Sequence, residues 1–330
     1  MIEIDGSIGG GQILRTALSL SALMGKPFKI INIRGKREKS GLQPQHLICV
    51  NSLIEICDAK VKGNELQSHE LEFTPGKIKS GNYSFDIGTA GSTTLVLQTL
   101  LPPLIFDTKK KSTIEIIGGT ANPLAPPAIE IKEVFLHWLK NIGINIKLEI
   151  EKEGFFPKGG GKIKIEIESC NKLKELSIVN NEPQLNIVAT ASKELQEREI
   201  CSRMIKGFKN NFLDIAKTNT KINYVNTLSP GCYIHANYKN IGMSVLGDKR
   251  KKAEDVGKEC AEKLKEEIES MAEIDSYTTD QLLIYLAMKG SGKIKTSRIT
   301  NHILTNVQTI EKFIDVKFKI KDNIITCEKN

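Results

Sequence analysis

Hydrophobic residues recur along the chain with two spacings, which predict strands alternating with helices. Residues 12–24 carry apolar side chains three and four positions apart, as an amphipathic helix does, whereas 112–117 is short and rich in β-branched residues. The order strand, helix, strand, helix, strand, strand occurs twice, which indicates a repeated unit. The predicted elements are 2–5, 12–24, 28–33, 46–57, 60–62 and 70–74 for the first unit, and 83–87, 92–105, 112–117, 128–142, 145–152 and 162–168 for the second.

The same order of elements occurs a third time only if another segment is inserted after the first strand of that unit. Its predicted elements are a strand at 176–179, a helix at 279–288, a strand at 293–296, a helix at 303–314, and strands at 316–320 and 323–327. The intervening segment has its own elements, namely strands at 185–191, 221–228 and 232–240 and helices at 194–211 and 253–271.

This pattern predicts an α/β (α+β) fold of repeated units, with the sheets facing inward and the helices outside. We expect a main domain formed by residues 1–179 and 274–330, and a smaller α/β domain inserted at 180–273.

Composition indicates a globular protein of the cytoplasm with no membrane partner. The 330 residues are 40% hydrophobic, 26% charged and 5% aromatic. No apolar run approaches eighteen residues, and the acidic, strand-like start is unlike a signal peptide. The seven cysteines form no C-x-x-C pair, which argues against a structural zinc site or a secreted disulfide scaffold.

The charge balance favours a polyanionic partner, although only weakly. The net charge of +8 suits nucleic acid or nucleotides, but a Lys/Glu/Ile-rich chain also matches thermophilic composition. The placement of arginine says more, because three of only seven, Arg15, Arg34 and Arg37, lie within the first forty residues. Since the planar guanidinium fits phosphate oxygens, this cluster suggests phosphate binding.

His302 is the candidate nucleophile, one of only five histidines in the chain. A basic strand at 293–298 precedes it and an apolar-periodic segment follows it, so His302 is predicted to lie where a helix begins. Free amides at a helix start bind anions, and the partial positive charge there favours a neutral imidazole, the form that attacks phosphorus. Alternatively, His302 is a surface residue that only satisfies the helix end.

Four polar clusters lie at the joints between the predicted elements. They are the glycine run 5–15, the basic loop 33–46, the segment 88–92 followed by Gln98, and the proline-rich segment 118–127. Each has a plainer interpretation when taken alone, because glycine turns also serve packing, charged loops are commonly solvated, and prolines stop strands.

Taken together, in this order and spacing, the clusters resemble the RNA 3′-terminal phosphate cyclase family over essentially the whole chain. The matching segments are the glycine run into Gln12-Ile13-Leu14-Arg15, the loop Ile33-Arg34-x-x-Arg37 ending in Gln45-His46, Ala90-Gly91-Ser92 with Leu97-Gln98-Thr99, Gly118-Gly119-Thr120 with Ala125-Pro126-Pro127, Gly154-Phe155-Phe156-Pro157-x-Gly159-Gly160-Gly161, Asp280-Gln281-Leu282, and His302.

The resemblance implies a ligase-type enzyme that uses ATP to convert an RNA 3′-phosphate into a 2′,3′-cyclic phosphodiester. The histidine matching His302 would attack the α-phosphorus of ATP, pass AMP to the RNA 3′-phosphate, and leave the neighbouring 2′-OH to expel AMP. An imidazole suits this role because it is nucleophilic when neutral and a good leaving group once protonated.

Residue roles also follow from the resemblance. Tyr277 and Pro126 would sandwich adenine, and Asp280 or Gln281 would lie near the ribose or His302. The remaining expected ATP-site residues are Gln98, Thr278 and Thr279. The residues expected to bind phosphate or RNA are Gln12, Arg15, Arg34, Arg37, Gln45 and His46.

Mg²⁺ or Mn²⁺ is an expected cofactor, but its ligands are not assigned. The family's loop usually reads Gly-Glu-Gly-Gly-Gly-Gln, whereas here Ile8 runs directly into Gly9, Gly10, Gly11 and Gln12. Two residues are therefore missing, including the glutamate that approaches the metal.

Two other functions stay open at this point. Non-catalytic members of the superfamily act in ribosome assembly and lack the nucleophilic histidine, so the presence of His302 argues against that role. The similarly repeated enolpyruvyl transferases bind small phosphorylated substrates, and their motifs do not explain His302 or the Arg34–Arg37 loop. The sequence does not select an oligomeric state, for which a homodimer is one candidate.

Overall fold

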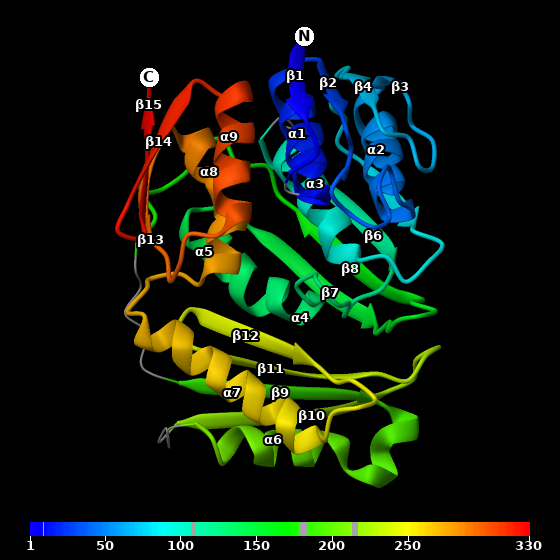
Figure 1. The fold of residues 1–330 in the computed structure, drawn as a ribbon, viewed down its shortest axis with the longest axis vertical. Coiled ribbons are helices and arrows are strands. Elements are labelled where there is room, and N and C mark those ends of the chain that lie inside the picture. The colour runs from blue at the N-terminus through cyan, green and yellow to red at the C-terminus, as the bar shows by residue number, and fades with distance from the viewer. Residues whose placement is uncertain (9, 107–109, 178–183, 213–216) are drawn as a thin grey trace.

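A computed structural model describes residues 1–8, 10–106, 110–177, 184–212 and 217–330. The first unit, at the upper right of Figure 1, forms a four-stranded sheet in the order β1-β2-β4-β3. β1 and β2 are parallel, and β4 is antiparallel to both β2 and β3. Its elements are β1 (Ile2–Asp5), α1 (Gly11–Met24), β2 (Phe28–Ile31), α2 (Pro44–Cys57), β3 (Lys60–Lys62) and β4 (Leu71–Thr74).

The second unit repeats this topology. Its sheet has the order β5-β6-β8-β7, with β5 and β6 parallel and the other pairs antiparallel. Its elements are β5 (Asn82–Asp86), α3 (Thr93–Phe106), β6 (Ser112–Gly118), α4 (Ala128–Glu130), a π-helical turn (Ile131–Phe135), α5 (Leu136–Asn141), β7 (Ile146–Lys152) and β8 (Gly161–Ile167). The predicted repeated-unit α/β fold is therefore confirmed.

The third unit keeps the last three strands of the pattern, in the order β13-β15-β14. Its elements are α8 (Ser276–Lys289), β13 (Ser291–Lys295), α9 (Asn301–Phe313), β14 (Val316–Lys321) and β15 (Ile324–Lys329). The opening strand predicted at 176–179 is not seen at residues 176 and 177, and residues 178 and 179 lie outside the described part of the chain.

The segment between the second and third units forms its own sheet, in the order β10-β9-β11-β12, below the rest in Figure 1. Its elements are β9 (Leu185–Ser192), a 3₁₀ helix (Lys193–Arg198), α6 (Ile200–Lys209), β10 (Thr218–Val225), β11 (Cys232–Tyr238), β12 (Ile241–Leu246) and α7 (Ala253–Glu269). Its buried hydrophobic residues form a cluster separate from that of the three units. We call this segment the insert; its exact domain boundaries stay a prediction.

Two predicted elements of the insert are wrong in detail. The single helix expected at 194–211 is broken at Glu199, whose φ of 51° lies in the left-handed region. The strand expected at 232–240 ends at a turn where Lys239 has a φ of 56°, and the unpredicted strand β12 follows it. That strand matters because it reaches the candidate site.

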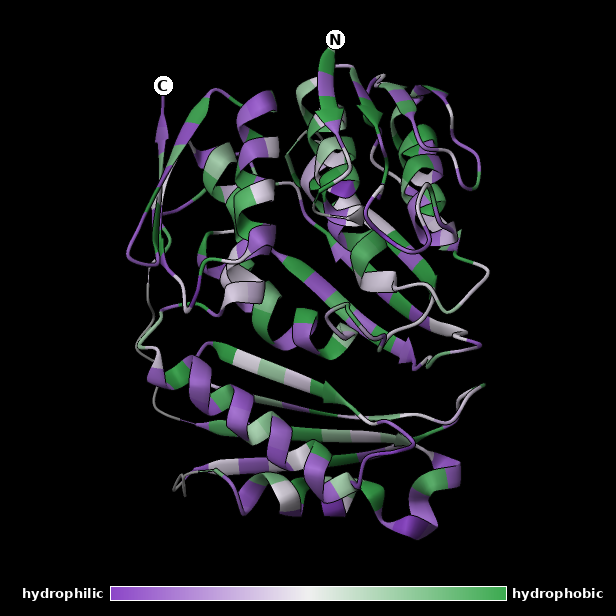
Figure 2. Cartoon of the chain, in the orientation of Figure 1, coloured by the Kyte–Doolittle hydropathy of each residue, from purple (hydrophilic) through white to green (hydrophobic). Residues whose placement is uncertain are grey.

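The predicted layering of the units is also corrected, because the helices lie at the centre and the sheets outside. α1 packs against α2, α3 and α9, and α3 also contacts α2 and α8. α3 is buried along nearly its whole length, and a helix that is apolar all round belongs in a core. The sheets keep one polar face, seen as alternating colours along strands in Figure 2, and that face is stable only towards water.

This packing brings the first turns of α1, α8 and α9 together, although they are far apart in the sequence. No helix among the described residues is both long and apolar enough to cross a membrane.

Candidate active site

A cavity of about 820 Å³ lies where the three units and the insert meet. Helix starts, the loops before α2 and α4, β12 and α7 contribute to its wall. The structure brings most of the predicted site residues to this cavity, namely Gln12, Arg15, Arg34, Arg37, Gln45, His46, Gln98, Pro126, Tyr277, Asp280, Gln281 and His302. Thr278 and Thr279 do not line it; both are buried in the first turn of α8.

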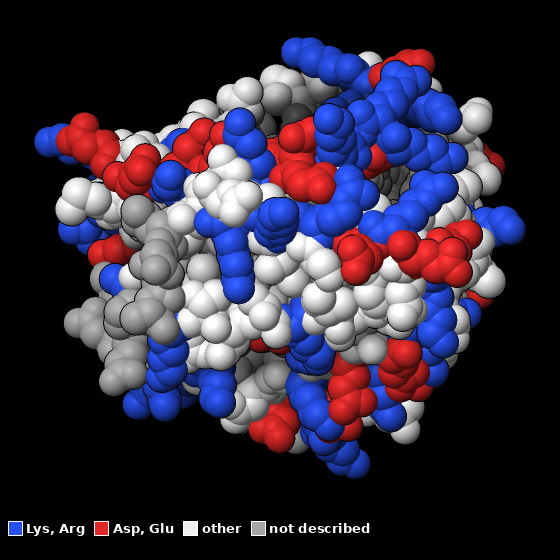
Figure 3. Space-filling view, turned by 90° about the horizontal axis from the view of Figure 1, so that it is seen from below, with Lys and Arg blue, Asp and Glu red and all other residues white. Residues whose placement is uncertain are grey.

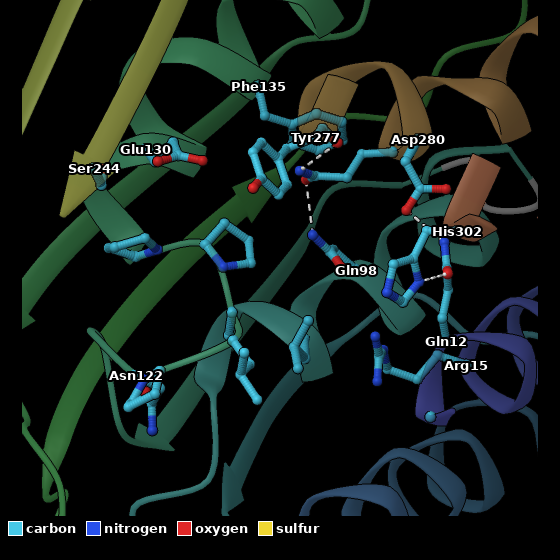
Figure 4. A pocket seen from close by; sticks show the side chains of 18 of the residues that line it. Gln12, Arg15, Gln98, Asn122, Glu130, Phe135, Ser244, Tyr277, Asp280 and His302 are labelled. Carbon is cyan, nitrogen blue, oxygen red and sulfur yellow. Dashed lines mark hydrogen bonds between the residues drawn. The ribbon is translucent and has the colours of Figure 1, made fainter. Parts of the chain in front are cut away.

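His302 is the second residue of α9, so it lies at a helix start as predicted. The hydroxyl of Thr300 caps this helix by accepting a hydrogen bond from the Ile303 amide at 3.2 Å. The His302 side chain is exposed and points into the cavity (Figure 4). A nucleophile needs this access to its substrate.

A hydrogen-bonded chain from Asp280 through Gln12 fixes the tautomer of His302. The Gln12 amide donates its Nε2–H to Asp280 Oδ2, so the Gln12 Oε1 faces His302 Nδ1 and accepts from it. Nδ1 must then carry the proton, because an amide oxygen only accepts. The lone pair is left on Nε2, which has no hydrogen-bond partner among the described residues.

Asp280 is itself held by Asn306, which is held in turn by Thr16. Asn306 donates its amide to the Asp280 side chain at 3.1 Å, while the Thr16 hydroxyl donates to Asn306 Oδ1 at 2.8 Å. Burial raises the pKa of Asp280, and the hydrogen bond from Gln12 and the nearby His302 act in the opposite direction. Both carboxyl oxygens accept hydrogen bonds, which suits the ionised form.

A basic wall, formed by Arg15, Arg34, Arg37 and His46, lines the cavity next to this chain, and Figure 4 shows Arg15 beside His302. Gly11 lets α1 approach it, because a Cβ there would lie 2.3 Å from His46 Nε2 and 3.0 Å from Arg15 Nη1. Burial, with Arg15 and Arg34 nearby, lowers the pKa of His46 to about 3. Its Nδ1 accepts from the Gln43 amide at 3.2 Å, so its Nε2–H is a neutral donor on the cavity wall.

The two arginines of the loop before α2 have different surroundings. Arg34 donates to the Gly41 carbonyl at 3.2 Å and to Lys39, so it also closes its own loop. Arg37 is exposed and lies beside Gly10, whose added Cβ would be 3.2 Å from the Arg37 guanidinium. Arg37 is therefore the cation more open to an incoming anion.

Tyr277 and two glutamines line the middle of the cavity. Gln98 donates to Gln281 Oε1 at 2.7 Å, and Gln281 donates to the Tyr277 carbonyl at 3.2 Å. This relay leaves the Gln98 Oε1 as an acceptor for a ligand. Tyr277 is 53% exposed, and the Arg298 guanidinium lies 5.7 Å from the centroid of its ring. Because Arg298 does not line the cavity, it supports the ring from outside.

Comparison with known proteins identifies the family. The model of the family described as RNA 3'-terminal phosphate cyclase matches residues 7–320. The chain belongs to the RNA 3'-terminal phosphate cyclase family. Proteins named RNA 3'-terminal phosphate cyclase from Caldivirga maquilingensis and Sulfolobus acidocaldarius are 39% and 41% identical to the chain. The alignments cover 100% and 97% of this chain and 99% and 97% of those relatives. A protein of the same name from Pyrococcus furiosus is 38% identical, over 98% of this chain and 96% of its own.

The resemblance stated from the motifs is thereby confirmed, as is the assignment to an enzyme family. The enolpyruvyl transferase alternative does not hold, because this match extends over nearly the whole chain.

Several cavity residues of this cyclase-family chain were missed by reasoning from the sequence. Asn306 follows His302 by one helical turn, and that spacing places both on one helix face. Glu130 lies at the end of the short helix α4, and no spacing in the sequence singled it out. Ser244 carried no signal, because its strand was not predicted. The others from the insert and the π-helical turn are Phe135, Met243, Val245, Leu246, Asp248, Lys251, Glu259 and Lys263.

The expected divalent metal has no preformed cage in the described part of the chain. No group of three or more His, Cys, Asp or Glu side chains there is placed to hold an ion. Asp5, the acidic residue before the glycine run, instead accepts hydrogen bonds from the Ser7 amide and Asn32. The described residues therefore do not form a Mg²⁺ site held by protein side chains alone.

Proposed function

We propose that this enzyme converts an RNA 3′-terminal phosphate into a 2′,3′-cyclic phosphodiester with ATP, through a histidine-AMP intermediate. The observation that carries the mechanism is the free Nε2 lone pair of His302 in a cavity with Arg15, His46 and Tyr277. Nucleophile, phosphate-binding donors and a ring for the base thus share one space. ATP would place its phosphates near His302 and its base near Tyr277 and Pro126.

In the first step, Nε2 of His302 attacks the α-phosphorus of ATP. The new N–P bond forms as the bond to the bridging oxygen breaks, and pyrophosphate leaves with that electron pair. The imidazole becomes positively charged, while the Nδ1 proton stays hydrogen-bonded to Gln12 and, through it, to Asp280. Arg15, with the neutral His46 donor, is placed to stabilise the phosphate oxygens.

In the second step, an oxygen of the RNA 3′-phosphate attacks the phosphorus of the adenylate and the N–P bond breaks. Neutral His302 is regenerated, because a protonated imidazole is a good leaving group. The RNA 2′-OH then attacks its own activated 3′-phosphorus, loses its proton, and expels AMP. The exposed Arg37 is suited to the incoming RNA phosphate.

The test is incubation of the purified protein with α-labelled ATP and Mg²⁺ or Mn²⁺, comparing wild type with His302→Ala. We expect an acid-labile, alkali-stable adduct mapped to His302 in the wild type, and none in the variant. The exposed position of His302 predicts an unchanged melting temperature for the variant, which is the control for folding.

Absence of label on the wild type with either metal would contradict the proposal. It would favour a non-catalytic RNA-binding role, the remaining alternative. We further propose a cytoplasmic location, since all seven cysteines are free and six are buried, as suits a reducing compartment.

A further inference from the structure

We propose that the exposed ring of Phe156 stacks on a base of the RNA substrate upstream of its 3′ end. This inference rests on the proposed function, which brings the RNA 3′-phosphate to His302, and it adds a binding subsite outside the cavity. Its starting point is the glycine-rich loop 154–161, which the chemistry at His302 does not use.

Phe156 is one of two exposed aromatic residues of the types Phe, Tyr and Trp in the described part of the chain. It is 67% exposed, and the other, Tyr277, lies in the cavity as the expected partner of adenine. Phenylalanine is a residue of protein interiors, and a large apolar side chain left in water marks an interaction site when polar residues surround it. The ring of Phe156 is therefore available to a ligand.

The backbone on either side of Phe156 is anchored. Phe155 is buried and packs against Tyr233 of the insert, with 6.3 Å between the ring centroids. Gly231 makes room for that ring, because a Cβ there would lie 2.2 Å from Phe155 Cγ. The Gly159 amide donates to the Phe155 carbonyl at 2.8 Å and closes the turn. A ring on an anchored turn loses little conformational freedom on binding.

A cation and a second apolar side chain lie beside this turn. Lys158 is exposed and forms no ion pair with another described residue, while its amide donates to Ser229 Oγ at 3.1 Å. Leu228 is 52% exposed and covers Gly160, whose added Cβ would lie 2.4 Å from Leu228 Cδ1. The two loops, from the second unit and from the insert, lie at the right of Figure 1 where those parts meet. Aromatic rings next to cations are the common means of binding single-stranded RNA.

A continuous surface leads from the basic wall to this turn. A Cβ added to Gly91 would lie 3.1 Å from Gln45 Cβ, and one added to Gly159 would lie 2.8 Å from Ala90 Cα. The loop 88–92 is thus packed between the phosphate-binding side chains and the loop of Phe156. It is low and open, since a Cβ added to Gly88 would meet nothing within 4 Å. RNA whose 3′ end lies in the cavity can therefore run over this loop towards Phe156.

The size of the apolar surface favours RNA over a protein partner. One aromatic ring and one leucine offer at most a few hundred Å², whereas a stable protein interface buries roughly 1,200–2,000 Å². The stacking of one base requires only the face of one ring. The unpaired Lys158 also suits a phosphate of the RNA backbone.

The test is isothermal titration of two single-stranded RNAs with a 3′-phosphate, a dinucleotide and an oligonucleotide of about eight nucleotides, without ATP. The proteins are wild type, Phe156→Ala, Phe156→Trp and the control Leu66→Ala, which removes an exposed apolar side chain outside the cavity. We expect Phe156→Ala to weaken binding of the longer RNA by about fivefold to a hundredfold, the worth of one stacked base, and to leave the dinucleotide unchanged. Phe156→Trp and Leu66→Ala should bind both RNAs as the wild type does.

A single abasic residue, moved along the longer RNA, locates the stacked base. At one upstream position it should weaken binding to the wild type, and at that position it should have no further effect in Phe156→Ala. Because the ring is exposed, the variant should keep the wild-type melting temperature, and its label on His302 from α-labelled ATP checks the cavity.

An unchanged affinity of Phe156→Ala for the longer RNA would overturn the inference, and so would equal weakening of both RNAs. If the substitution changes the sedimentation of the protein but not its RNA binding, Phe156 is a contact between copies of the chain and the inference is wrong. If the wild type takes no label on His302 but the loss for longer RNA is seen, the proposed function fails and the RNA subsite stands. If the label is present and that loss is absent, only this inference fails.

Discussion

The tautomer of His302 is set by the side chains of Gln12 and Asp280. Asp280 orients the Gln12 amide, and that amide oxygen holds the proton on His302 Nδ1. The three residues come from α8, α1 and α9. In a catalytic triad a carboxylate contacts the histidine directly and orients it. Here the Gln12 amide lies between the Asp280 carboxylate and His302.

We predict that Asp280→Asn slows formation of the His302 adduct by roughly tenfold to a hundredfold. An asparagine can accept with one atom only, so it cannot hold Gln12 and Asn306 in their present orientations, and the wrong tautomer of His302 becomes populated. The measurement is the single-turnover rate with α-labelled ATP, together with the nitrogen chemical shifts of His302. Asp86→Asn, which changes an exposed carboxylate outside the cavity, is the control. A wild-type tautomer in Asp280→Asn would contradict this account.

A second prediction separates the roles of two arginines of the basic wall, Arg37 and Arg15. Arg37→Ala should weaken transfer of AMP to RNA by about tenfold or more and change self-adenylylation less, because Arg37 is exposed whereas Arg15 is partly buried beside His46. The two half-reactions are measured separately, with Lys36→Ala as the control, since Lys36 is exposed and does not line the cavity. A normal rate of transfer to RNA in Arg37→Ala would remove Arg37 from the site.

At the scale of elements, the start of α1 determines how closely the basic loop approaches the nucleophile. Gly10 begins the helix with a φ of 61°, and Gly11 leaves space for His46 and Arg15. The glycine run therefore serves packing of the donors, and access of a phosphate to the helix amides stays a prediction.

We predict that Gly11→Ala lowers the free energy of unfolding by about 1–3 kcal/mol, because the added Cβ must displace buried His46. His46→Ala made in the same chain should recover part of that loss, since it removes the atoms that clash. Thermal or urea unfolding of the wild type, the two single variants and the double variant gives the interaction free energy between positions 11 and 46. Simple additivity of the two effects would show that the contact is not the cause.

At the scale of the whole molecule, the cavity depends on the insert docking against the three units. Tyr233 of β11 donates to Glu153 at 2.7 Å, and Trp138 of α5 donates to the Asn240 carbonyl at 3.1 Å. Seen from the side of the insert, Figure 3 shows basic and acidic side chains interspersed, with a denser basic group toward the upper right. The charge on this face does not by itself mark a path for RNA.

Stability should depend on pH through Glu130, which lies between the π-helical turn and the insert. Its pKa is about 8 in the folded chain, against an ordinary value of 4.5, because of burial, with Asp275 also raising it. The folded state therefore holds a proton that the unfolded state has lost, so its stability contribution is present below pH 4.5 and is lost as pH rises through about 8. We expect the wild-type melting temperature to fall from about pH 6 to about pH 9, and this fall to be smaller in Glu130→Gln. Parallel profiles for the two proteins would refute the assignment, and Glu133→Gln is the control.

The sequence predicted the helices and strands of the repeat well, because the spacing of apolar residues and the turn residues are local properties. The prediction failed where the local pattern of a segment differs from what the folded chain requires of it. Residues 194–211 look like one amphipathic helix, yet Glu199 takes a left-handed conformation. The layering was wrong because a sequence pattern shows that a face is apolar, but not which neighbour covers it.

The sequence by itself determined the family, the repeated units, the position of His302 at a helix start, and twelve of the residues that line the cavity. These follow from motifs and periodicity, which each segment carries alone. Only the tertiary structure decided that Gln12 and Asp280 fix the tautomer of His302, and that Glu130 and the unpredicted β12 meet beyond Tyr277. The physical reason is that the direction of a hydrogen bond and the make-up of a cavity wall depend on distances between segments far apart in the sequence, by up to 290 residues. Those distances are set by the packing of the helices.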